Sequence, residues 1–177
     1  MRKLILTISL FAVIMFGANG QTNLAFNSVP VVNGKVVFEN FILTEVGGTP
    51  EQGYAKLQKW VREKYKGNQM VSAIRFDDKG QTVSVSAKTN VDNTTTMNYR
   101  LDASVTGSGC MIVIRDITYQ SKSNDSSVFP KVVTAEQTIT DQAVNSGGDE
   151  KKQREVFRTA TLSFLNKLYS EISSLYK

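Results

Sequence analysis

Few residues in this chain could carry out chemistry. It has no histidine and a single cysteine, Cys110. The chain therefore lacks the commonest general base and zinc ligand, and it cannot form a Ser-His-Asp or Cys-His arrangement. Cys110 precedes an apolar segment, where a free cysteine is more often a buried thiol than a nucleophile. We predict no catalytic residue, no cofactor site and no metal site.

Two local patterns resemble functional motifs only superficially. Asp77-Asp78 lies in a four-residue turn and falls short of the six or more oxygen ligands that calcium requires. Gly107-Ser108-Gly109 lacks the lysine and the following helix of a phosphate-binding loop, and its flanks indicate a hairpin turn. A pair of glycosidase-type carboxylates stays open as an alternative, but no Asp or Glu is distinguished enough to be named for it.

One group of polar side chains is predicted to share a surface. Two neighbouring strands alternate apolar and polar residues, which places their polar side chains on one wet face. Hydroxyls, an amide and several cations on such a face could bind an anionic or polar ligand, although an ordinary solvated sheet face has a similar composition. The candidate residues of this face are Arg75, Ser84, Ser86, Lys88, Asn98, Arg100 and Arg115.

The elements that would position these residues are five strands and two long helices. The ten residues from Met97 to Thr106 give the clearest period-2 alternation. Both faces of 35–43 are apolar, so we expect that strand to be central or covered on both sides. The order strand, helix, four strands, helix predicts an α+β fold with a mostly antiparallel sheet and both helices on one face. The strands are expected at 35–43, 70–76, 82–88, 97–106 and 110–119.

Both long helices have recognisable signals. Thr49, Pro50 and Gln52 form a capping-box start, and Gly67 supplies the stop. The second helix, 149–176, has an apolar stripe expected to pack on the sheet, and its basic start, 151–158, could overhang it. The stripe consists of Phe157, Ala160, Phe164, Leu168, Ile172 and Leu175, widened by Leu165 and Tyr169. Residues 120–148 are loop-rich; the capping pattern at 134–137 leaves a short helix and irregular structure equally open.

The first twenty residues read as a secretory signal peptide. Arg2 and Lys3 precede a thirteen-residue apolar run, which is too short to span a bilayer as a helix. Ala18 and Gly20 are the small residues that a signal peptidase reads, so we place the cut between Gly20 and Gln21. The predicted protein is exported, to the periplasm or beyond, with no membrane span after cleavage.

Cleavage leaves 157 of the 177 residues, with 19 Lys and Arg against 16 Asp and Glu, a net charge of +3. This mild excess is not the footprint of a nucleic-acid-binding protein. The length suits one domain, 34–177, preceded by a lead-in at 21–33. With one cysteine, the domain must be stabilised by packing and not by an internal disulfide.

The segment Val-Pro-Val-Val-Asn-Gly-Lys-Val-Val-Phe at 29–38 resembles the opening of a family of small exported proteins of unknown function from Bacteroides-type bacteria, described as TATA-binding-protein-like. The aromatic face around Trp60 resembles the helix that follows in that family. The resemblance covers about 29–119. It implies the same five-stranded order with both helices on one face, and it supplies no catalytic residue and no implication of DNA binding.

The leading hypothesis is a non-enzymatic envelope protein that binds an envelope protein, a glycan or a small polar ligand through the open sheet face. One alternative is an interaction module in which the C-terminal helix joins a partner or a second copy, so that the chain is a monomer or a weak homo-oligomer. Another is a carboxylate-based hydrolase of envelope polymers.

Overall fold

The computed structural model describes residues 24–44, 48–121 and 131–177. The predicted signal segment and its cut between Gly20 and Gln21 lie outside these ranges. The strands are β1 (Val31–Val32), β2 (Lys35–Val36), β3 (Phe38–Leu43), β4 (Val71–Asp77), β5 (Thr82–Asn90), β6 (Thr95–Thr106), β7 (Gly109–Ser121) and β8 (Val132–Thr134). The helices are α1 (Pro50–Lys64), α2 (Ala135–Thr138), α3 (Asp141–Asn145), the short 3-10 helix η1 (Gly148–Glu150) and α4 (Lys151–Ser173).

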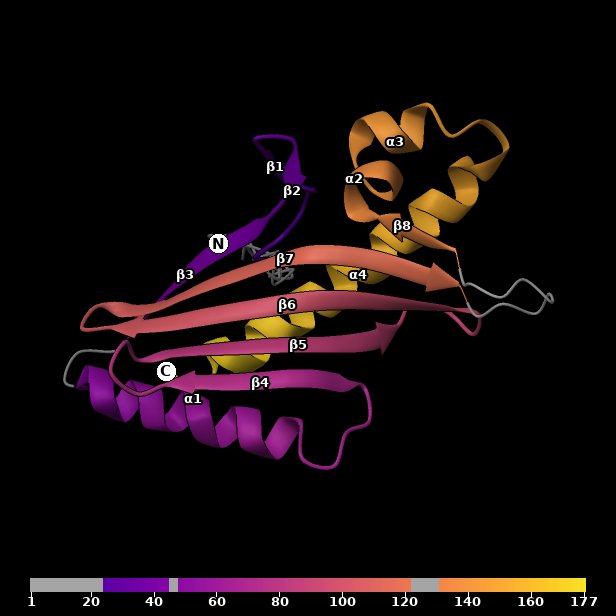
Figure 1. The fold of residues 1–177 in the computed structure, drawn as a ribbon. Helices are drawn as coiled ribbons and strands as arrows, with labels where there is room; N and C mark the ends of the chain where they lie inside the picture. Colours follow the sequence, from indigo (N-terminus) through magenta and orange to yellow (C-terminus); the bar gives the residue numbers. More distant parts are fainter. Residues whose placement is uncertain (1–23, 45–47, 122–130) are drawn as a thin grey trace, which may run out of the picture.

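The main sheet is antiparallel throughout and has the order β3-β7-β6-β5-β4 (Figure 1). A sixth strand, β8, pairs with the far end of β7, along the same edge that β3 occupies at the near end. The predicted α+β class and antiparallel sheet are confirmed, and β8 is the strand that the sequence did not indicate. Three residues are too few to show a period-2 pattern, so β8 depends on its partner for its conformation.

Strand β6 supplies the centre of the core. Its apolar residues are buried, as the alternation predicted: Met97, Tyr99, Leu101, Ala103 and Val105. The Tyr99 hydroxyl lies 3.1 Å from the hydroxyl of Tyr65, at the end of α1. The Tyr99 ring centroid lies 5.1 Å from that of Phe164 in α4. One side chain of β6 thus contacts both long helices, which cover the same face of the sheet.

The start of α1 has the predicted capping box. The Thr49 hydroxyl accepts from the Gln52 amide at 3.3 Å, and the Gln52 side chain accepts from the Thr49 amide at 3.2 Å. Pro50 occupies the first turn, where its missing N–H leaves no hydrogen bond unmade. The cap fixes where the helix begins and therefore which of its faces meets the sheet.

Strand β7 contains a β-bulge at its centre. The β6–β7 register passes from Asn98–Thr118 to Arg100–Arg115, so two steps along β6 match three along β7. Asp116 takes a left-handed conformation with φ of 56°, which aspartate tolerates better than most residues.

The bulge keeps one face of β7 apolar along its whole length. Ile112 and Ile114 before it, and Ile117 and Tyr119 after it, are all buried on the helix side although the two pairs differ in parity. An unbulged strand would turn Ile117 and Tyr119 to the uncovered face.

The predicted strand at 35–43 is wrong in two respects. It is broken at Val37, whose amide donates to the Pro30 carbonyl at 3.3 Å and closes the β1–β2 hairpin. Its second part, β3, is not central, because within the main sheet it pairs only with β7. Phe38 and Ile42 enter the core, but Leu43 is 75% exposed and no described element covers the second apolar face.

The basic start of α4 does not overhang free. The Arg154 guanidinium donates to the Ala143 carbonyl at 2.7 Å, and the Arg158 Nε donates to the Ile139 carbonyl at 2.7 Å. The capping signal at 134–137 does begin a helix, α2, and α2 and α3 receive these arginines. The overhang was expected because the sequence pattern of 120–148 did not predict a firm element on which α4 could pack.

The apolar stripe of α4 is rotated from the predicted one. Thr161 and Leu165 are fully buried, whereas Ala160 and Phe164 are only partly so. Thr161 is tolerated there because its hydroxyl lies 2.8 Å from the Tyr119 hydroxyl. A threonine in an apolar stripe carries no signal by which the sequence could have marked this pair.

The close approach of β3 to β7 makes Gly109 irreplaceable. A Cβ at Gly109 would lie 1.9 Å from the Ile42 carbonyl oxygen, whereas one at Gly107 would meet nothing nearer than Pro50 at 4.0 Å. We expect Gly109→Ala to lower the free energy of unfolding by more than about 2 kcal/mol and Gly107→Ala to change it by less than about 0.5 kcal/mol. Urea unfolding measures both, and equal midpoints for the two variants would contradict the β3–β7 register.

Candidate functional site

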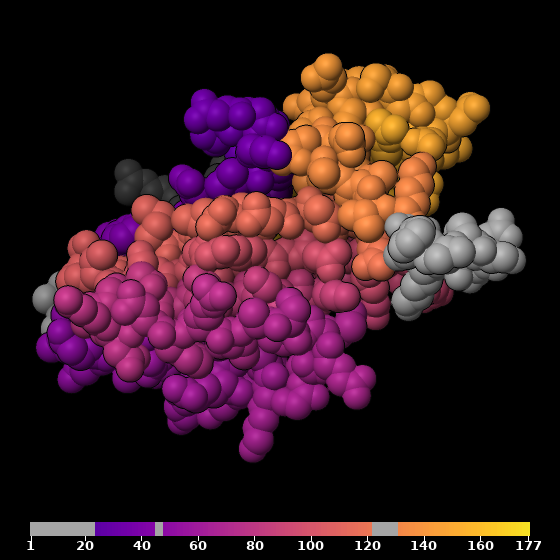
Figure 2. Space-filling model, viewed as in Figure 1, coloured from indigo at the N-terminus to yellow at the C-terminus, as the bar shows by residue number. Residues whose placement is uncertain are grey.

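The uncovered face of the sheet carries the polar side chains that the sequence singled out. In Figures 1 and 2 this face is turned toward the reader, and Figure 1 shows α4 behind the sheet. The pairings Arg75–Ser84, Ser86–Arg100 and Arg100–Arg115 place these residues on one side of the sheet. Lys88 and Asn98 are paired with each other in the next row. The structure therefore brings all seven candidate residues to one surface.

Asp102 is the centre of this surface, and the sequence analysis did not nominate it. The Ser84 hydroxyl donates to its Oδ1 at 2.6 Å, and the Arg100 Nε donates to the same atom at 3.0 Å. The Arg115 guanidinium donates to its Oδ2 at 3.0 Å. The signal for this cluster was present, because Asp102 follows Arg100 by two residues and so shares its face.

The environment of Asp102 favours its ionised form. Partial burial acts to raise the pKa of this carboxyl, but the hydrogen bonds from Ser84, Arg100 and Arg115 outweigh it and hold the pKa below its ordinary value. At neutral pH the cluster is therefore a carboxylate shared by two guanidinium groups. Arg115 is further engaged by Asp116 at 3.5 Å.

The cations of this face are thus of two kinds. Arg115 is committed to carboxylates on its own strand and on β6, whereas Arg100 uses only its Nε in the cluster. Arg75 and Lys88 are exposed and have no hydrogen bond or ion pair from their side chains to any residue of the described ranges. Free donors are therefore concentrated over β4, β5 and the middle of β6.

Apart from Asp116, which pairs with Arg115, the other described carboxylates of the face lie away from this group. Glu39 is opposite Val113 at the β3 edge, and Asp77 is at the end of β4, where it accepts from the amides of its own turn. Two small open hollows flank Asp102, of about 210 Å³ beside Ser104 and about 240 Å³ beside Ser86. These hollows are open and shallow, so the surface suits an extended ligand that lies across the strands. A compact ligand that needs a pocket closed on all sides would fit it less well.

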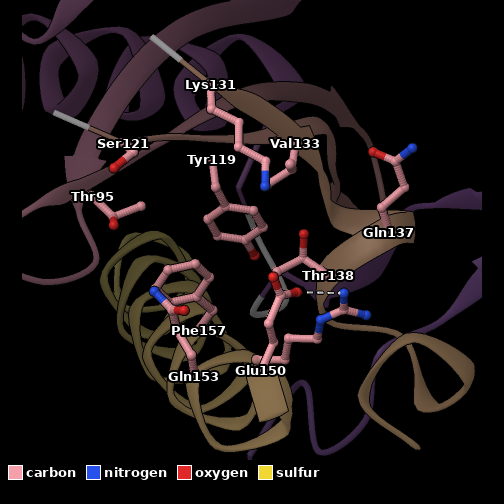
Figure 3. A pocket seen from close by; sticks show the side chains of 11 residues that line it. Thr95, Tyr119, Ser121, Lys131, Val133, Gln137, Thr138, Glu150, Gln153 and Phe157 are labelled. Atoms are coloured by element: carbon pink, nitrogen blue, oxygen red, sulfur yellow. Dashed lines mark hydrogen bonds and ion pairs between the residues drawn. The ribbon is translucent and has the colours of Figure 1, made fainter. Parts of the chain in front are cut away.

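A larger cavity of about 420 Å³ lies beyond the bulge, between β7, β8, α2 and the start of α4 (Figure 3). The Tyr119 and Phe157 rings stack at its inner wall, with centroids 5.3 Å apart. Lys131, Glu150 and Arg154 bring charge to it. No sequence signal marked this cavity, because its lining comes from five short stretches that only the fold brings together.

The cysteine is buried, as predicted. Cys110 is fully buried, and that burial raises the pKa of its thiol to about 11. Within the described ranges, no three His, Cys, Asp or Glu side chains are grouped to hold a metal ion. The cavity in Figure 3 contains one described carboxylate, Glu150, and not a close pair.

The fold defines the class of the protein: an antiparallel sheet with a four-strand meander and two long helices on one face is the TATA-binding-protein-like α+β architecture. A TBP-like protein from Parabacteroides distasonis superposes with a TM-score of 0.72 at 20% identity, covering 84% of this chain and 96% of that one. A DUF4468 family protein from Bacteroides ovatus gives 0.69 at 21% identity, covering 85% and 91%.

These likenesses confirm the predicted fold and the resemblance to TBP-like proteins of Bacteroides-type bacteria. Neither protein's name states an activity or a ligand. No family model matches the sequence, and no curated protein matches it. No helix in the described part of the chain is long and apolar enough to cross a membrane.

We predict that Asp102→Asn lowers the free energy of unfolding by about 1–2 kcal/mol at pH 7, because it weakens charge-assisted hydrogen bonds. The folded-state pKa of Asp102 lies below the unfolded value, so its contribution is present above the unfolded pKa and is lost as pH falls through the folded one. Urea unfolding from pH 7 down to about pH 2 should therefore show the wild-type advantage shrinking below about pH 5.

Asp116→Asn is the matched control for this prediction. Asp116 is 63% exposed on its side chain, its ion pair is long at 3.5 Å, and asparagine accepts its left-handed conformation. We expect it to change stability by less than about 0.5 kcal/mol. A wild-type advantage over Asp102→Asn that does not vary with pH would contradict the role given to the carboxylate.

Proposed function

We propose that the protein is an exported, non-enzymatic binding module of the cell envelope that holds an anionic ligand or partner on the uncovered sheet face. The observation that carries this proposal is the separation of cations described above. Arg75 and Lys88 are exposed, and the terminal nitrogens of Arg100 form no hydrogen bond with the described residues, whereas Asp102 is already occupied by donors of its own sheet. A ligand with carboxylate, sulfate or phosphate groups would meet unoccupied donors there.

Several features support binding over catalysis. The chain has no histidine, its thiol is buried, and the Asp102 carboxylate is held ionised by three donors instead of being poised to exchange a proton. A hydrolase with paired carboxylates would need two of them free in one cleft, whereas Asp102 and Asp116 are both paired with Arg115 on an open face and Asp77 is used in its own turn.

The alternative, in which the C-terminal helix binds a partner or a second copy of the chain, is not supported by the way α4 packs. The most apolar side of α4 is consumed by the sheet, where Leu165, Leu168 and Ile172 are fully buried. Its exposed side is polar apart from Val156, which is 54% exposed. A seam needs a second continuous apolar stripe, and the described α4 does not present one.

We predict that Arg75→Ser combined with Lys88→Ser weakens binding of dextran sulfate about tenfold, since each free cation contributes a charge-assisted hydrogen bond. The thermal midpoint should stay within about 2 °C, because neither side chain has a described internal partner. Calorimetric titration against dextran sulfate measures the affinity, and neutral dextran should not bind.

Lys59→Ser on the exposed side of α1, combined with Lys66→Ser in the turn after it, removes the same charge and is the control. Lys59 is 77% exposed and forms only a 3.9 Å pair with Glu63. This double variant should change the affinity less than about twofold, because only the general effect of the lower net charge remains. An equal loss from both double variants, or none from Arg75 and Lys88, would overturn the sheet face as the site.

Export is tested separately. When the full chain is expressed in a Gram-negative host, we expect the extracytoplasmic protein to begin at Gln21, and Ala18→Arg to leave the precursor uncleaved, since signal peptidase requires a small residue at that position. Intact mass spectrometry distinguishes the two forms. A cell-associated protein that retains residues 1–20 in the wild type would contradict export by cleavage.

A further inference from the structure

The cavity between β7, β8 and α4 is physically separate from the sheet face and has its own chemistry. At about 420 Å³ it falls within the range of about 300–1,000 Å³ typical of small-molecule sites. Its lining includes polar and apolar groups from β6, β7, β8, α2 and α4 (Figure 3). A volume of this kind is filled by one small molecule and not by a polymer chain.

The charges of the cavity leave one cation unmatched. Glu150 pairs with Arg154 at 2.8 Å, and Arg154 also donates to the Ala143 carbonyl at 2.7 Å, so this arginine is committed. The Lys131 side chain extends into the cavity (Figure 3). It makes no hydrogen bond or ion pair with another residue of the described ranges.

The charge of Lys131 also acts on Glu150, at the opposite rim of the cavity. The pKa of Glu150 is lowered, first by its hydrogen bond to Arg154 and then by the charges of Arg154 and Lys131. Lys131 thus acts on Glu150 through its charge without forming an ion pair with it, and the charged groups of the described lining (Lys131, Glu150 and Arg154) sum to +1. An anion that enters the cavity would meet an ammonium group that has no competing described partner.

The apolar wall is held rigidly. Phe157 is stacked on Tyr119 with an interplanar angle of 19°. Tyr119 is fixed in turn by its 2.8 Å hydrogen bond to the buried Thr161. Val133, on β8, adds an aliphatic side chain to the lining. Because these groups are held by contacts within the protein, binding against them requires little reorganisation.

We propose that this cavity is a binding site for a small ring compound bearing a carboxylate, with Lys131 pairing the carboxylate and the ring lying against Phe157 and Val133. Aromatic acids and sugar acids share this chemistry. The apolar wall favours the former, and the polar lining contributed by Thr95, Ser121 and Gln153 favours the latter. The site does not depend on the sheet face, and the two are tested with different ligands.

The test is an NMR titration of the purified protein with indole-3-acetate and with glucuronate, each compared with its neutral counterpart, indole-3-acetamide or glucose. We expect one acid to shift the amides of Ser121, Val133 and Gln153 saturably, and its neutral counterpart to bind at least about tenfold more weakly. Whichever acid binds identifies the class. No saturable shift at these amides with either acid, or equal affinity for acid and neutral compound, would overturn the proposal.

Variants locate the interaction. Lys131→Gln should weaken the acid about tenfold and leave the neutral compound unchanged, whereas Lys152→Gln, which removes an exposed cation of α4, should leave both unchanged. Gln153→Trp, at an exposed position on the rim, should block the cavity without disturbing the core. Arg75→Ser combined with Lys88→Ser should have no effect, so that failure here is distinguishable from failure of the sheet-face proposal. Unchanged acid binding in Lys131→Gln would refute the assigned role of the ammonium.

Discussion

The register of β7 against β6 is the constraint on which the rest of the structure depends. β7 is bordered by β6 on one side and by β3 and β8 on the other, so any shift in it moves every neighbour. The bulge at Asp116 lets its two halves, which differ in parity, bury their isoleucines on the same face. A β-bulge also adds local twist. It turns Arg115 toward Asp102 on one side and directs Tyr119 to Thr161 on the other. Core, polar cluster and cavity wall therefore follow from one inserted residue.

The Asp102 cluster shows why charged residues on an open sheet face need not make it a strongly charged surface. Two of its arginines are bound to an internal carboxylate, an arrangement that orders their side chains and removes part of their charge from any ligand. A nucleic-acid saddle requires the opposite: many unpaired cations and apolar wedges at kink sites. The open face of this chain pairs half of its cations internally and carries Glu39 and Asp77 at its margins. The shared fold by itself therefore says nothing in favour of DNA binding.

What the sequence could predict followed from patterns within single elements. The capping box at Thr49, the alternation along β6 and the order of the elements each depend on neighbours in the chain, and the structure has them as expected. What it could not predict depends on partners distant in sequence. β8 exists as a strand because β7 is beside it, and Thr161 enters the core because Tyr119 supplies a hydrogen bond. In β3, apolar residues on both faces suggested double coverage; the structure instead leaves Leu43 exposed. Apolar composition alone does not reveal whether a covering element exists.

The position of the cavity explains how one small domain could serve two kinds of ligand. The residues before and after each side chain of the sheet face point to the other side of the sheet, into the core. The shape of the face is therefore tied to the packing of α1 and α4. The cavity lies where β7 extends past that packing and is completed by β8, α2 and the first turns of α4. These short elements are anchored by discrete polar contacts, such as Arg158 to the Ile139 carbonyl and Glu136 to the Val36 amide at 2.9 Å, and by Ala135 and Ile139, which are buried in the main core. Substitutions at the exposed rim, such as those at Lys131 or Gln153, therefore cost the main sheet little, whereas substitutions of Tyr119 or Phe157 at the inner wall would disturb the core.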